Sequence, residues 1–403
     1  MTTQSRNPTF IILILGALST VSPFSIDMYL PSFPQIAQSL GCPTARVSLS
    51  LSSYFIGMGL GQILYGPFLD HFGRKRPLYF GLGLYILSSV GCLAAGSLEI
   101  LIALRFLQAL GGCAAGVASM AMVRDFFHVK ESAKVFSLLM LILSVSPLLA
   151  PTVGGFVTLH LGWRWIFVLL AAISLAILAV VIFFLPEGHK PDPKATLSFK
   201  KSLKNFAMIL KEPKFHAYAI VGSLSISGLF AYIAGSPIIF LEIYNVGPKF
   251  YGAIFALLAA GFIGGSQVNI WLLKRYSSEE ILRKAIWGQC LVGMLFLLFA
   301  LAGWLNLAGT LVFLFAVLSC AGMVNPNAGA LALRPFGRHA GSASALLGFI
   351  QISFGSLTSG AVGFFNFKSA LPTITILALT ALAGLLACGE LVEPVSALVK
   401  KTR

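Results

Sequence analysis

Apolar stretches of about twenty residues recur along almost the whole 403-residue chain, with short polar segments between them. The hydrocarbon core of a bilayer is about 30 Å thick, and a helix needs about twenty apolar residues to cross it. The pattern therefore predicts twelve membrane-spanning helices, at 9–30, 46–69, 77–96, 99–122, 135–158, 163–186, 215–243, 250–273, 284–304, 308–333, 340–366 and 371–392.

The basic residues gather in alternate gaps between these stretches. If both termini are cytoplasmic, the inner segments hold 23 of the 28 Lys and Arg residues. The outer loops then hold only Arg46, Arg164, Lys249 and Lys368. Cytoplasmic loops of membrane proteins carry such an excess of positive charge, so the sequence predicts a multi-pass protein with both termini inside. The net charge of +15 is accounted for by anionic lipid rather than nucleic acid.

The chain lacks the sequence features of several other classes. Charged residues make up 10% of it, against about 25% in soluble proteins. The six cysteines form no CxxC pair and the six histidines show no metal-ligand spacing, so no metal site is predicted. Phosphate-binding, zinc-protease and nucleophile-elbow motifs do not occur. We therefore expect neither an ATP-driven pump nor an enzyme, and no cofactor other than protons as the coupling ion.

One polar, Pro- and Lys-rich segment at 187–213 interrupts the pattern between the sixth and seventh predicted helices. A shift of 205 residues aligns Pro43 with Pro248, Gly59 with Gly264 and Gln62 with Gln267. Repeated halves are common in secondary transporters. We therefore predict an all-α membrane protein of two pseudo-symmetric six-helix bundles, 1–186 and 214–403, joined by a cytoplasmic linker with a basic amphipathic stretch.

Two charged residues, Asp27 and Arg105, lie clearly within the predicted spans. A charge at mid-membrane costs at least about 2.5–3.5 kcal/mol, so each of these residues is expected to have a partner or a function. Both fall in the outer half of the first bundle, where they can pair or share a hydrated cavity. Poor hydration favours a neutral carboxyl group, whereas a nearby guanidinium favours the carboxylate, so we predict a proton site at Asp27 regulated by Arg105. The alternative is that Asp27 ends its helix and faces water.

The loop after the second span combines Gly66, Asp70, Gly73 and Arg74. Asp70 ends a helix, where its charge opposes the helix dipole and needs a compensating partner. Gly73 permits the sharp reversal that returns the chain to the membrane. A simple basic turn would explain the cations but not the Gly–Asp–Gly spacing.

This loop, from Gly66 to Lys75, resembles the major facilitator signature G-x-L-x-D-R-x-G-R-K/R, with Phe68 for Leu and His71 for Arg. Arg105 to Gln108 resembles that superfamily's R-x-x-Q-G motif. The fifth span resembles the antiporter motif of the same superfamily. It keeps the proline and the last glycine pair of that motif, as Pro151, Gly154 and Gly155. Small residues replace the other glycines: Ser137, Ser146 and Ala150. The segments 27–31 and 124–127 look like the Bcr/CflA drug-efflux subfamily.

The resemblance implies a proton-coupled multidrug efflux transporter of the bacterial inner membrane, acting by alternating access and as a monomer. It implies that Arg105 governs protonation of Asp27, and that Asp70 latches the second span to the eleventh at the inner side. The fifth span around Pro151, Gly154 and Gly155 would seal the outer side. The alternative is a proton-coupled exporter or exchanger of one metabolite, such as an amino acid or nucleoside.

Five polar or aromatic residues are candidates to line the substrate cavity: Tyr29, Tyr54, Gln108, Tyr232 and Asn325. Asn325 adjoins Pro326, and a structural kink is the other interpretation. Glu242, near the outer end of the seventh span, is expected to be a solvated end charge and is the second candidate for proton coupling.

Overall fold

The computed structural model describes residues 8–188, 199–336, 340–365 and 369–392, and within these ranges every regular element is a helix. The bounds of the α-helices are α1 Pro8–Asp27, α2 Phe33–Leu40, α3 Thr44–Phe72, α4 Lys75–Leu93, α5 Leu98–Phe126, α6 Val129–His160, α7 Arg164–Phe184, α8 Phe199–Leu210, α9 Pro213–Pro237, α10 Pro248–Leu272, α11 Ser278–Leu301, α12 Leu307–Leu333, α13 Ala340–Phe364 and α14 Leu371–Ala387. A 3₁₀ turn spans Leu30–Ser32, and π-helical segments span Ile238–Ile243 and Cys388–Val392.

The predicted all-α membrane fold is confirmed. Eleven helices of the described residues are long and apolar enough to cross a membrane. The remaining predicted span, at 77–96, corresponds to α4, which is shorter and begins with the charged pair Lys75 and Arg76. It nevertheless packs within the first bundle, against α5 and α7.

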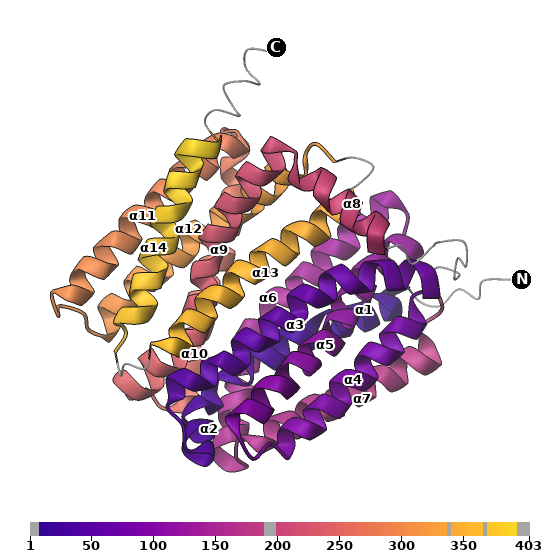
Figure 1. Ribbon diagram of the computed structural model, residues 1–403, viewed down its shortest axis with the longest axis horizontal. Helices are drawn as coiled ribbons and strands as arrows, with labels where there is room; N and C mark the ends of the chain where they lie inside the picture. The colour runs from indigo at the N-terminus through magenta and orange to yellow at the C-terminus, as the bar shows by residue number, and fades with distance from the viewer. Residues whose placement is uncertain (1–7, 189–198, 337–339, 366–368, 393–403) are drawn as a thin grey trace, which may run out of the picture.

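The long helices form two groups of six (Figure 1). The first contains α1 and α3 to α7, and the second contains α9 to α14. The two groups meet along α3 with α13 and along α6 with α10. Figure 1 shows α3 and α13 running side by side through the centre of the molecule, with α2 at one end of the bundles and α8 at the other. We call these the α2 end and the α8 end.

Local sequence explains where several helices begin and turn. The side chain of Ser97 accepts a hydrogen bond from the backbone N–H of Ile100 at the start of α5, and Ser277 forms a capping box with Glu280 at the start of α11. Gly73 has a φ of 82° between α3 and α4, a conformation that favours glycine, as the predicted reversal requires.

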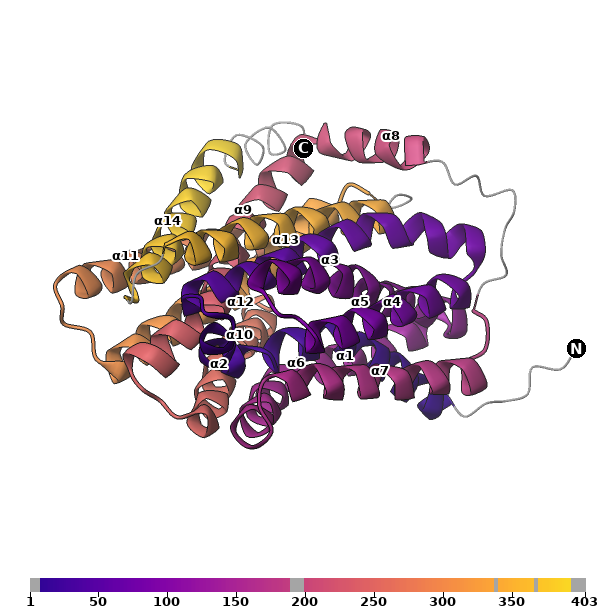
Figure 2. The same ribbon diagram turned by 60° about the horizontal axis from the view of Figure 1, so that its bottom comes forward.

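The short helix α8 is the amphipathic stretch predicted after the prolines of the linker. Phe206 and Ile209 are buried against the second bundle, while Lys204 is exposed. Figure 2 shows α8 outside the long helices, beside the end of α9, and Figure 1 shows its axis crossing the direction of α13. Residues 189–198 of the predicted linker lie outside the described residues, and the predicted division at 187 and 213 stays a prediction.

Candidate functional site

Arg105 is the centre of a polar cluster inside the first bundle, and its side chain is fully buried. Its Nη1 donates to Oε1 of Gln108 at 2.6 Å, and its Nη2 donates to the backbone oxygen of Ser25 at 2.9 Å. Gln108 in turn donates through Nε2 to Oγ of Ser89 at 2.7 Å. The Gln108 contact orients the guanidinium, and the Ser25 contact ties α5 to the last turn of α1.

Two tyrosines enclose the same guanidinium. The Arg105 Cζ atom lies 4.5 Å from the ring centroid of Tyr29 and 4.2 Å from that of Tyr54. Tyr29 follows α1, and its hydroxyl is 2.8 Å from Oγ of Ser50 on α3. Cation–π contacts of a desolvated cation are worth about 2 kcal/mol, so the rings stabilise a charge to which the described residues bring no carboxylate within hydrogen-bond distance.

Asp27 is the last residue of α1 and is 5% exposed. The ion pairs of the described residues include none between Asp27 and Arg105. The two residues are connected instead through the carbonyl of Ser25, which lies two residues before Asp27 and accepts from Arg105. The structure thus places both predicted residues in one region without pairing them, and Asp27 does not face water.

Two tyrosines of the second bundle lie in the region of Asp27. Tyr232 of α9 and Tyr251 of α10 lie close enough to interact electrostatically with the Asp27 carboxyl group. The Tyr251 hydroxyl is 2.7 Å from Oγ of Ser236, whereas the buried Tyr232 hydroxyl has no hydrogen-bond partner among the described residues. The 3₁₀ turn that follows Tyr29 contacts both α9 and α10. Asp27 therefore lies where the two bundles meet.

Four of the five predicted cavity residues gather in this region. Tyr29, Tyr54 and Gln108 contact Arg105, and Tyr232 lies within electrostatic range of Asp27. Asn325 belongs to a separate contact, in which its Oδ1 accepts from Nε2 of Gln351 at 2.9 Å. Sequence reasoning missed Ser25, Ser89 and Tyr251, because single hydroxyl groups in apolar helices give no distinctive signal.

The loop between α3 and α4 is organised by Arg74. Its Nη1 donates to Asp70 at 2.9 Å, and its Nε donates to Asp125, at the end of α5, at 2.8 Å. Burial alone would lower the pKa of Arg74, but its hydrogen bonds to Asp125 and Asp70 and the charges of both carboxylates raise it above its ordinary value. Glu187 accepts from the backbone N–H groups of Arg74 and Lys75, which stabilises the start of α4.

The predicted latch from Asp70 to the span at 340–366 is not among the interactions of the described residues. Asp70 pairs with Arg74 of its own loop, and its side chain is 70% exposed. A Cβ atom added at Gly66 would meet nothing within 4 Å. In the conformation seen here, the latch residues therefore bind within the first bundle.

We expect Asp70→Asn to reduce the transport rate several-fold while the protein stays folded. Arg74 keeps its pair with Asp125, and an exposed ion pair adds only about 0–1 kcal/mol to stability, so the melting temperature should hardly change. Glu131→Gln, an exposed carboxylate at the same end, is the matched control. Equal transport rates for the two variants would show that Asp70 belongs to a simple basic turn.

The motif in α6 lies at close backbone approaches near the α2 end. A Cβ atom added at Gly154 would lie 2.1 Å from the backbone oxygen of Met28, which follows α1. One added at Gly155 would lie 2.6 Å from the backbone oxygen of Pro248, the first residue of α10. Ala150 and Pro151 are buried beside them. The motif therefore joins α6 both to the turn after α1 and to the second bundle.

The side-chain hydrogen bonds that cross between the bundles cluster at the same end. Oγ of Ser52 donates to Oγ of Ser359 at 2.9 Å, and Ser356 donates to the backbone oxygen of Ser52 at 3.3 Å. Thr44, the first residue of α3, donates to the carboxylate of Glu242. Glu242 is therefore half-buried and hydrogen-bonded rather than the solvated end charge that the sequence suggested.

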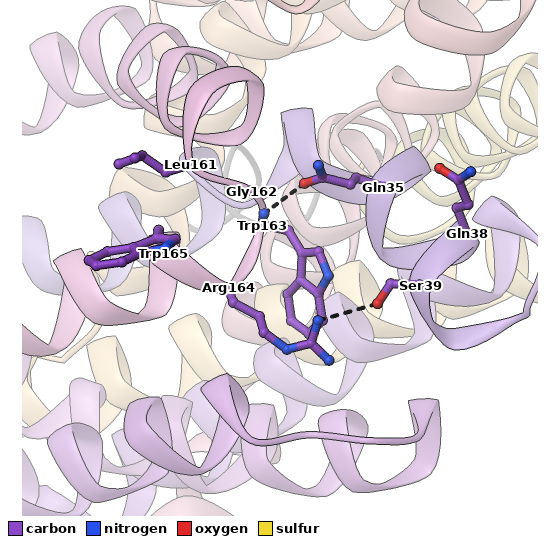
Figure 3. A pocket seen from close by; sticks show the side chains of 8 residues that line it. All are labelled: Gln35, Gln38, Ser39, Leu161, Gly162, Trp163, Arg164 and Trp165. Carbon is purple, nitrogen blue, oxygen red and sulfur yellow. Dashed lines mark hydrogen bonds between the residues drawn. The ribbon is translucent and has the colours of Figure 1, made fainter.

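A pocket of about 390 Å³ opens at the α2 end beside α2 and the start of α7 (Figure 3). The backbone N–H of Trp163 donates to Oε1 of Gln35 at 2.6 Å. The guanidinium of Arg164 donates to the backbone oxygens of Leu93 and Ala95, and to Ser39. These contacts fasten α2 and the end of α4 to α7, and none of the predicted site residues lines this pocket.

Comparisons with known proteins agree with this geometry. The model of the family described as Major Facilitator Superfamily matches residues 15–360. The chain is 34% identical to the uncharacterized MFS-type transporter YdgK of Bacillus subtilis, over 95% of this chain and 96% of that protein. It is 32% identical to the bicyclomycin resistance protein homolog of Haemophilus influenzae, over 92% and 93%. It is 31% identical to the multidrug resistance protein MdtL of Shigella dysenteriae, over 85% of each.

Solved structures show the same fold. The crystal structure of a D-xylose-proton symporter matches with a TM-score of 0.70 at 14% identity, covering 94% of this chain and 97% of that one. A bacterial homolog of the human lysosomal transporter Spinster, in an inward-facing and unoccupied conformation, also matches with a TM-score of 0.70, at 13% identity over 96% and 99%.

Proposed function

The chain belongs to the Major Facilitator Superfamily, and on this premise we propose that it exports small, largely apolar compounds in exchange for protons. The relatives named for bicyclomycin resistance and multidrug resistance support drug efflux as the activity. The proposal takes protons as the coupling ion, needs no other cofactor and treats the monomer as the working unit. The proposed activity is transport, without an enzymatic reaction.

The observation that carries the proton coupling is the position of Asp27. Its carboxyl group is buried near the boundary between the bundles, within electrostatic range of Tyr232 and Tyr251, and its helix is held by Arg105 through Ser25. Burial favours the neutral carboxyl group, and hydration favours the carboxylate. A rocking motion that separates the bundles would hydrate Asp27, so the protonation state and the conformation are coupled.

Arg105 would regulate this site through the backbone. Its guanidinium holds the carbonyl oxygen of Ser25 and is itself held by Gln108 and two aromatic rings. A movement of α5 would therefore shift the last turn of α1, and Asp27 with it. Tyr29, Tyr54 and Tyr232 would line the path of an apolar substrate next to these charges.

We further propose that the α8 end faces the cytoplasm of a bacterium and that the protein lies in its inner membrane. Lys75, Arg76 and Lys204 lie at this end, and the charge distribution of the whole chain favours the same orientation. The hydrogen bonds between the bundles and the closest approaches of their backbones lie toward the α2 end, which supports a transporter that is closed to the outside.

Transport in inside-out membrane vesicles tests the proposal. We expect a panel of fluorescent, apolar cationic and neutral dyes to accumulate when the vesicle interior is made more acidic than the outside, because protons then leave the vesicle as dye enters. Collapse of the gradient with an ionophore should abolish accumulation. Vesicles without the protein provide the control. Gradient-driven movement of one amino acid or nucleoside, with no transport of any dye, would favour the alternative function, a metabolite exporter.

A further inference from the structure

Glu242 lies in an unusual piece of backbone. The residues Ile238–Ile243 form a π-helical segment directly after α9, whose last residue is Pro237. A π-helical turn changes the direction in which the following side chains point, and such turns are frequent at functional sites. Here the segment brings a carboxylate, which the sequence would leave at a solvated helix end, to the boundary between the bundles.

The partner of Glu242 belongs to the other bundle. Oγ1 of Thr44, at the first residue of α3, donates to Oε1 of Glu242. Thr44 is buried, and Glu242 is half-buried. The chain after the π-helical segment is also fixed, because the hydroxyl of Tyr244 lies 2.6 Å from Oγ1 of Thr310 on α12. Both ends of the Thr44–Glu242 bond are therefore held by their own bundle.

The bond differs from the other hydrogen bonds between the bundles. In the described residues, two other side-chain hydrogen bonds join α3 to the second bundle. In both, a serine hydroxyl donates to a neutral acceptor, either a hydroxyl or a backbone carbonyl oxygen. Only the bond to Glu242 has a charged acceptor in this set. A hydrogen bond to an ionised group is about twice as strong as one between neutral groups. It is therefore expected to contribute most to keeping the two bundles together.

We propose that Thr44 and Glu242 form a latch that holds the α2 end closed and must break each time the cavity opens there. The latch rests on the alternating-access function proposed above. It assigns Glu242 a gating role that is distinct from proton coupling at Asp27. Because the bond exists only in the closed form, it shifts the balance between the two conformations without touching the substrate.

The test measures the opening of the α2 end directly. The six native cysteines are replaced, and Ser48→Cys supplies a probe one turn after Thr44 on α3, at a fully buried position. Its rate of labelling by a membrane-impermeant thiol reagent, added from outside, reports how often this end opens. The assay needs neither a substrate nor a proton gradient, so its outcome is independent of the transport assay.

We expect Glu242→Ala and Thr44→Val each to raise the labelling rate about tenfold, equivalent to about 1.4 kcal/mol. The double variant should label no faster than either single variant, because both remove the same bond. Glu242→Gln keeps an acceptor oxygen and should fall between the parent and Glu242→Ala. Glu99→Ala removes an exposed carboxylate at the same end of the first bundle and should leave the rate unchanged.

A second experiment stabilises the closed α2 end instead of destabilising it. A Thr44→Cys/Glu242→Cys double variant should be cross-linked by a bifunctional thiol reagent that replaces the length of the glutamate side chain, and the cross-linked protein should label at Ser48→Cys more slowly than the untreated one. Unchanged labelling in both Glu242→Ala and Thr44→Val, additive effects in their combination, or equal labelling of the cross-linked and untreated protein would each overturn the latch.

Discussion

Proton-driven efflux should be lost when Asp27 is replaced by Asn, while the substrate still binds. The amide keeps the volume of the side chain and its hydrogen-bonding capacity, but it cannot release a proton. A membrane potential of 100 mV is worth about 2.3 kcal/mol per charge. A tenfold substrate gradient requires about 1.4 kcal/mol, so loss of one coupled proton removes enough driving force to abolish accumulation.

The measurement is proton release on substrate binding by purified protein in detergent. The wild-type protein should release protons when substrate is added, and Asp27→Asn should not. Asp27→Glu keeps a carboxyl group near the same place and should retain part of the release. Glu99→Gln, an exposed carboxylate, should behave as wild type. If Asp27→Asn releases as many protons as the wild type, the coupling residue lies elsewhere, and Glu242 would be the next to examine.

Arg105 shows how far the sequence predicts this site. Charges inside apolar spans are costly, so the sequence identifies Asp27 and Arg105 as candidates and places them in the same half of the membrane. It does not predict that Arg105 binds the Ser25 carbonyl rather than the Asp27 carboxylate. That choice depends on how α1 and α5 are rotated about their axes, and a hydropathy pattern defines the position of a helix along the chain but not its rotation.

The fold is predicted more completely than the contacts between its helices. The lengths of the apolar stretches lead directly to the long helices, because the thickness of the bilayer fixes helix length. The sequence does not predict the partners of carboxylates that lie just beyond the ends of the long helices. Glu187 binds the start of α4 and Glu242 binds Thr44, although each is more than one hundred residues from its partner. Neither pairing leaves a local pattern in the sequence.

The π-helical segment after α9 explains the error at Glu242. A regular α-helix continued from Pro213 would carry Glu242 to a position set by 3.6 residues per turn. The wider turn at Ile238–Ile243 changes this position. Because π-helical turns have no reliable sequence signature, the sequence suggested a solvated end charge where the structure has a contact between the bundles.

Gly154→Ala should reduce transport to below about a tenth of the wild-type rate, although the substitution adds a single methyl group. That methyl carbon would lie 2.1 Å from the backbone oxygen of Met28, a distance that carbon and oxygen atoms do not tolerate. The neighbouring atoms belong to backbone, so no side chain can rotate away. The turn after α1 must therefore move away from α6, and the α2 end cannot close as it does here.

Three alanine substitutions separate this steric effect from other causes. Alanine favours a helix over glycine by up to about 1 kcal/mol, so a loss of activity cannot come from helix propensity. Gly155→Ala, with its added carbon 2.6 Å from the Pro248 oxygen, should impair transport less than Gly154→Ala. Gly83→Ala on α4, where nothing lies within 4 Å, should have no effect. With the Ser48→Cys probe, labelling from outside should rise in the order Gly83→Ala, Gly155→Ala, Gly154→Ala. Equal transport and labelling in all three variants would mean that the turn at Met28 can move without cost. The close approach at Gly154 would then not control closure of the α2 end.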